Sequence, residues 1–186
     1  MNRRRFLVGA VGTGTIAVAA PWVQAASAAS DDELAYANFG VSGELLLADF
    51  YAKAIEADVY SAPATAVLRR GRAAATQHAK ALGDLLVGAG QTAPAVDDFA
   101  FEWPEGTFAT ATAAAKAGTT VLRALLGAYQ SALATLSEPD YRILYASLAA
   151  GIGQQLGALL GRAGVEPFPV AVDLEAASAA LEGYLG

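Results

Sequence analysis

The chain has 186 residues, a net charge of −6, 55% hydrophobic and 16% charged residues, one histidine and no cysteine. It is too apolar for a disordered chain and too acidic to bind nucleic acid through charge. Without cysteine it has no disulfide, thiolate metal site or cysteine nucleophile. Abundant alanine with few valines and isoleucines favours an all-α fold, and the length fits one domain.

Residues 1–30 have the three parts of an export signal. Three arginines at 3–5 precede Phe6 and a leucine, a weakly hydrophobic run with glycines follows, and small residues allow cleavage after Ala26 or Ala28. The order of paired arginines, one variable residue, phenylalanine and leucine resembles the twin-arginine export motif. We therefore expect export to the periplasm, the cell envelope or the extracellular space by that route, which carries folded proteins.

The alternative for this segment is a retained membrane anchor, the one case in which we expect contact with a membrane. Its arginines are its only charged residues, so cleavage leaves 9 basic and 18 acidic residues, a net charge of −9. A partner attracted by charge alone would then be a cation.

Apolar residues at helical spacing predict a first helix that is capped by Asp31 or Asp32 and runs to about Tyr60, and a second from about Ala64 to Val87. The residues expected to face inward are Phe39, Gly43, Leu46, Leu47, Phe50, Tyr51, Ala54 and Ile55, followed by Val67, Gly71, Ala74, His78, Leu82 and Leu85.

The opposite faces of these two helices are polar. Asp49 and Lys53 have the spacing of an ion pair within one helix. Arg69, Arg70 and Arg72 belong to the exposed face of the second helix. They indicate either a solvated surface or a contact with an acidic partner.

A long crossover at about 89–107 contains Phe99, Phe101 and Trp103, whose alternation indicates an extended segment anchored on the bundle. A third helix is expected over 108–136 and a fourth from Ser137 to about Arg162, followed by a tail, 164–186, with a short helix over 173–184. Helix pairs joined by one crossover are typical of a ferritin-like four-helix bundle. The inward residues expected in the third helix are Val121, Leu122, Leu125, Leu126, Tyr129, Leu133 and Leu136.

Residues 143–161 are uncharged, and Gly153, Gly157 and Gly161 have the spacing of a membrane helix seam. The adjacent polar pair Gln154 and Gln155 in the middle of the run argues against a span. A buried bundle helix with close backbone approach explains the run equally well.

Several short motifs resemble the ferritin-like domain family of exported bacterial proteins and together cover nearly all of residues 32–186. They are Gly-Glu-Leu-Leu-Leu-Ala-Asp-Phe-Tyr at 43–51, Gln-His-Ala-Lys-Ala-Leu at 77–82, Asp-Phe-Ala-Phe at 98–101, Gly-Ala-Tyr at 127–129 and Pro-Phe-Pro at 167–169. The resemblance implies a four-helix bundle. In iron-binding members of this superfold, two helices each give one Glu and two each give Glu-x-x-His.

Two of these six ligands are present. Glu44 matches the first-helix Glu and His78 the second-helix His, but Ala75 occupies the position of the Glu three residues before that His. The third helix, 108–136, and residues 143–165 contain no Asp, Glu or His. We expect no complete di-iron site, no catalytic residue and no cofactor. Glu44 and His78 are residual candidates for iron or another divalent metal, and the glycines at 153, 157 and 161 indicate that the bundle has closed over the former site.

Glu44 and His78 are both expected to point inward. A contact between them, with Tyr51 or Tyr129 as a third hydrogen-bonding group, would satisfy a buried carboxylate. The pair is then either a structural polar contact or a mononuclear metal site completed by water or a partner. The absence of any contact is the remaining alternative.

One further cluster is acidic and lies on the crossover. It consists of Asp97, Asp98, Glu102 and Glu105, which lack the spacing of a calcium loop and indicate either a polar surface or a loose cation site.

Three functions remain open. The leading hypothesis is an exported, metal-free bundle with a binding, structural or stress-related role, acting through an unidentified protein partner or self-association. The second is a metal-binding oxidase or iron-handling protein, and the third a membrane-tethered subunit of a larger complex. A cavity for a small apolar ligand between alanine- and glycine-rich helices is a further hypothesis.

Overall fold

The computed structural model describes residues 30–136, 138–163 and 171–185, and this part of the chain is helical, without strands. The all-α prediction is confirmed. The elements are α2 (Asp31–Glu56), α3 (Ala62–Gly88), the short 3-10 helix η3 (Val96–Asp98), α4 (Ala111–Thr135), α5 (Pro139–Ala163) and α6 (Leu174–Leu185). The predicted signal lies outside the described residues except for Ser30, as do residues 164–170 of the tail.

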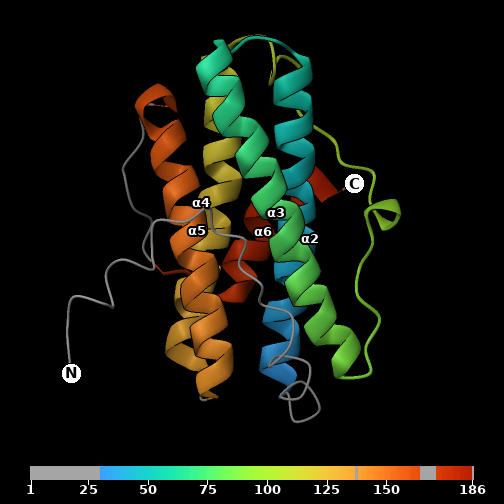
Figure 1. Cartoon of the computed structure of the whole chain (residues 1–186). Helices are drawn as coiled ribbons and strands as arrows, with labels where there is room; N and C mark the ends of the chain where they lie inside the picture. The colour runs from blue at the N-terminus through green and yellow to red at the C-terminus, as the bar shows by residue number, and fades with distance from the viewer. Residues whose placement is uncertain (1–29, 137, 164–170, 186) are drawn as a thin grey trace, which may run out of the picture.

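The four long helices lie side by side (Figure 1). α2 and α3 form one antiparallel pair and α4 and α5 another. The connection over residues 89–110 follows the length of the bundle, from the end of α3 to the opposite end where α4 begins. α6 packs against α2 and α4.

Helix α2 begins with a capping box one residue before the predicted caps. The Ser30 Oγ accepts a hydrogen bond from the Glu33 backbone N–H at 3.4 Å, and the Glu33 carboxylate accepts one from the Ser30 N–H at 2.7 Å. The prediction that Asp31 or Asp32 caps the helix was wrong, because serine followed three residues later by glutamate satisfies two free N–H groups at once.

The core confirms the inward faces expected for α2 and α4, with Phe39, Ile55 and Leu133 only partly buried. The inward face predicted for α3 was wrong by one residue at several positions. Its buried residues are Thr65, Leu68, Gly71, Ala75, Ala79, Leu82, Leu85 and Leu86, whereas Val67, Ala74 and His78 are partly exposed. The reason is that α3 packs along α2 and makes little contact with α5.

Close packing occurs at glycines of α2, α3 and α4, and on α5 at Gly151 rather than at Gly153 or Gly157. Side chains fill the space beside these glycines: Leu82 at Gly40, Leu125 at Gly43, Tyr51 at Gly71 and Phe50 at Gly118. Gly153 and Gly157 have no neighbouring atom within 4 Å of an added Cβ, so the interpretation that α5 had closed over a former site was wrong. None of the described helices is both long and apolar enough to be a candidate membrane span.

The connection is attached to the bundle by aromatic packing and one strong hydrogen bond. Phe101 and Trp103 pack against the core, and the Trp103 Nε1–H donates to the Asp49 carboxylate at 2.7 Å. Phe99 stacks on Phe101 with 5.3 Å between ring centroids. The predicted Asp49–Lys53 ion pair is confirmed at 3.9 Å.

Two glycine-to-alanine substitutions test this packing. Gly118→Ala places a methyl group against the buried Phe50 ring, so we expect the free energy of unfolding to fall by about 1–3 kcal/mol. The control Gly157→Ala adds a methyl group in open space, so we expect a gain of up to about 1 kcal/mol from helix propensity. Urea unfolding measures both, and equal effects at the two sites would contradict the packing described.

Candidate functional site

A fully buried carboxylate lies where α2, α3 and α4 meet. Glu44 on α2 is 0% exposed. Its Oε1 accepts a hydrogen bond from the Tyr129 hydroxyl on α4 at 3.0 Å and lies 3.0 Å from the His78 Nδ1 on α3. The predicted contact between Glu44 and His78 is thereby confirmed, with Tyr129 as the third group.

His78 connects this cluster to α5. Its side chain is 13% exposed, and the ring edge carrying Cε1 and Nε2 faces Gly151. A Cβ at Gly151 would lie 3.0 Å from the His78 Cε1, so the absence of a side chain there leaves room for the imidazole. Because Nδ1 faces a carboxylate, the tautomer that donates from Nδ1 is favoured.

Burial and the nearby Glu44 together shift the pKa values of His78 and Tyr129. Burial lowers the pKa of His78, but the hydrogen bond and the negative charge of Glu44 outweigh it, so this pKa is raised above 6.5. Burial and the charge of Glu44 raise the pKa of Tyr129 far above its ordinary value of 10.0. The Tyr129 hydroxyl therefore stays protonated and acts as a donor.

Tyr51, the other predicted partner of Glu44, instead contacts α5. Its hydroxyl donates to the Gln155 Oε1 at 2.7 Å, and its ring lies against Gly71. Burial, with a smaller contribution from Glu44, raises the pKa of Tyr51 well above 10.0. The sequence reasoning missed this role of Gln155, although the Gln154–Gln155 pair in an uncharged run was the available signal.

Several buried polar atoms near the middle of the bundle have no hydrogen-bond partner among the described residues. They include the Glu44 Oε2, the Tyr145 hydroxyl and the Gln155 Nε2. Glu44 thus makes both of its described hydrogen bonds through one oxygen.

The residues around Glu44 do not fit a di-iron centre. Two bridged cations need several carboxylates. The side chain that α4 directs at Glu44 is the neutral Tyr129, and α5 presents Gly151 to His78. Within the described part of the chain, no group of three or more His, Cys, Asp or Glu residues is placed to hold a metal.

A groove open to solvent separates α3 from α5. One part of this groove has a volume of about 300 Å³ and is lined by Arg70, Gly151 and Gln155 among others. It continues into a part of about 260 Å³ beside Pro63 and Leu159. The partly exposed positions of α3 that were predicted to be buried, Val67 and Ala74, lie along this groove.

The other two candidate clusters lie on the surface. Arg69, Arg70 and Arg72 are exposed, and no ion pair joins any of them to another described residue. Asp97, Asp98, Glu102 and Glu105 are also exposed, and the Asp98 carboxylate accepts a hydrogen bond from the Ala95 N–H at 2.7 Å.

No protein-family model, curated protein or solved structure matches this chain.

Two tyrosine substitutions test the hydrogen bond to Glu44. Tyr129→Phe removes a donor from a buried carboxylate, so we expect a loss of about 1–3 kcal/mol in the free energy of unfolding. Tyr145→Phe is the matched control, since this buried hydroxyl has no described partner and its removal should be neutral or stabilising. Urea unfolding distinguishes the two, and equal losses would show that the Glu44 contact contributes nothing.

The raised pKa of His78 predicts that stability falls with increasing pH. The stabilisation by the Glu44–His78 pair is complete below the unfolded pKa, about 6.5, and is lost as pH rises through the higher folded pKa. The chain has one histidine and no cysteine, so no other side chain has its ordinary pKa in this window. Urea unfolding between pH 6 and pH 9 should show the fall in the wild type, and His78→Gln should flatten it. An unchanged slope in the variant would contradict the assignment.

Proposed function

We propose that this chain is an exported ferritin-like bundle without a complete di-iron site, which acts by binding rather than by oxidase chemistry. Its role is then a binding, structural or stress-related one in the cell envelope. The partner is an unidentified protein, a second copy or a small molecule, and no nucleic acid is involved.

The hydrogen bonding of Glu44 carries this proposal. In a di-iron protein this carboxylate would face several others across the bundle. Here its Oε1 is bonded to Tyr129 and His78, and α4 has no Asp, Glu or His with which to complete a metal site. A tyrosine and one histidine occupy one oxygen of this carboxylate in place of metal ions.

The helix arrangement supports the ferritin-like part of the proposal. Two antiparallel pairs with a long connection between them are the arrangement expected of a bundle with one crossover. The twin-arginine resemblance of residues 1–30 supports the export part. The open groove between α3 and α5 supports a binding role, since ligand sites in helical bundles are common between helices.

The unpaired Glu44 Oε2 favours the second candidate, a metal-binding ferritin-like oxidase or iron-handling protein. A single divalent ion could use this oxygen if water or a partner supplied the remaining ligands. Such a centre would differ from the six-ligand set of the superfold.

Metal content separates the two candidates. We expect protein matured in its own host to contain less than about a tenth of an equivalent of iron or other divalent metal, because the described donor set is too small to retain it. Elemental mass spectrometry measures this beside a Glu44→Ala/His78→Ala double variant. Near-stoichiometric metal that disappears in the double variant would overturn the proposal.

A further inference from the structure

The groove between α3 and α5 has one polar part and one apolar part. Arg70, Gln154 and Gln155 line the polar part, while Pro63 and Leu159 belong to the apolar one. Val67 and Ala158 line both parts, so the groove is continuous. From Arg70 back to Pro63 it follows α3 for about 10 Å.

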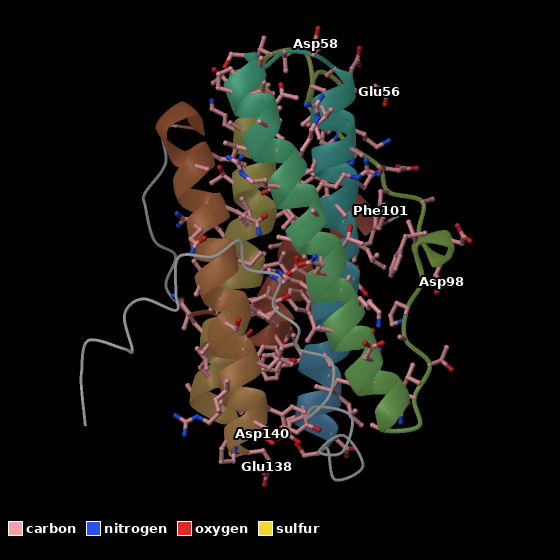
Figure 2. All side chains as sticks on the ribbon, in the orientation of Figure 1. Glu56, Asp58, Asp98, Phe101, Glu138 and Asp140 are labelled. Atoms are coloured by element: carbon pink, nitrogen blue, oxygen red, sulfur yellow. The ribbon has the colours of Figure 1, made fainter. Side chains whose placement is uncertain are left out.

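Among the described residues, no carboxylate lines this groove. The chain has 18 acidic residues, yet none lies between positions 59 and 83 or between 141 and 163. Figure 2 shows acidic side chains at both ends of the bundle, at Glu56 and Asp58 and at Glu138 and Asp140, and on the connection at Asp98. The charged residue that the groove presents is therefore a cation, on a protein that is acidic as a whole.

Arg70 is the cation that lines the groove, and it has no ion pair among the described residues. A guanidinium binds a carboxylate through two parallel hydrogen bonds. The Gln155 side chain lines the same part of the groove. Its Oε1 accepts a hydrogen bond from Tyr51, and its buried Nε2 is a donor without a described partner.

The apolar part is suited to a hydrocarbon chain. None of the described residues that line it is charged, and Val67, Leu68 and Leu159 supply its branched aliphatic side chains. A ligand that fills both parts needs one anionic head and one flexible apolar tail.

We propose that this groove binds a free fatty acid, with its carboxylate on Arg70 and Gln155 and its alkyl chain along Val67, Leu68 and Leu159. The inference deepens the proposed function by naming a ligand class, and it rests on that function only in requiring a binding protein. A free carboxylate, rather than a phospholipid headgroup on a membrane, matches the single groove-lining cation.

Calorimetric titration of the full chain with laurate, below its micelle concentration, tests the head contact. We expect Arg70→Gln to weaken laurate binding at least tenfold. The matched control Arg72→Gln removes a charge from an exposed position of the same helix outside the groove lining, so its affinity should stay within about twofold of the wild type. Equal affinity of the wild type and Arg70→Gln, or no binding of laurate by the wild type, would overturn the proposal.

The tail contact is tested separately. Ala158→Leu puts a strong helix former at an exposed position and fills the groove, so the fold should persist and laurate binding should weaken. The uncharged lauryl alcohol should bind more weakly than laurate. Equal binding of the alcohol, or binding to phosphatidylglycerol vesicles without binding to laurate, would contradict a fatty-acid site.

Metal content measured on the same samples keeps the two proposals distinguishable. Metal-poor protein that does not bind laurate would refute the fatty-acid site alone. Protein with near-stoichiometric metal that still binds laurate through Arg70 would refute the metal-free function and support the groove.

Discussion

The interior of this bundle depends on one carboxylate that has no access to water. Glu44 is fully buried, and an ionised carboxylate in that position requires hydrogen-bond donors or a positive charge close by. His78 and Tyr129 supply them from two other helices, each at 3.0 Å from the same oxygen. Removing either partner leaves a buried carboxylate with fewer donors, which lowers the free energy of unfolding. The relative placement of α2, α3 and α4 is thus restricted by a polar contact as well as by packing.

Glycines on α2 and α5 leave room for the two side chains that contact Glu44. Gly40 lies against the Tyr129 ring, and Gly151 leaves space for the imidazole of His78. A side chain at either glycine would press on a partner of Glu44. The glycines of α5 that face away from the core are open, and α5 stays apart from α3 along the groove. The bundle is therefore tightly packed around the carboxylate and open on one face. That open face, the groove between α3 and α5, is the surface on which we propose binding.

Much of the fold could be predicted from the sequence, because apolar spacing and Pro- and Gly-containing breaks locate long helices well. The second helix was predicted at about Ala64 to Val87 and observed at Ala62–Gly88. The Glu44–His78 contact was also predicted and is present, although His78 lies at the edge of the buried face of α3. The exact face of α3 could not be predicted, since alanine and glycine distinguish buried from exposed faces weakly. The role of Gln155 depends on which helix Tyr51 reaches, and that is set only by tertiary packing.

The most direct test of this account is the titration of His78 by NMR, which is unambiguous because the chain contains one histidine. Because the hydrogen bond and charge of Glu44 outweigh burial, the pKa of His78 should lie above 6.5 in the folded protein. In Glu44→Gln the hydrogen bond and charge that raise the pKa are weakened or lost while burial remains, so it should fall below 6.5. A pKa at or below 6.5 in the wild type that does not change in Glu44→Gln would contradict the central role of this contact.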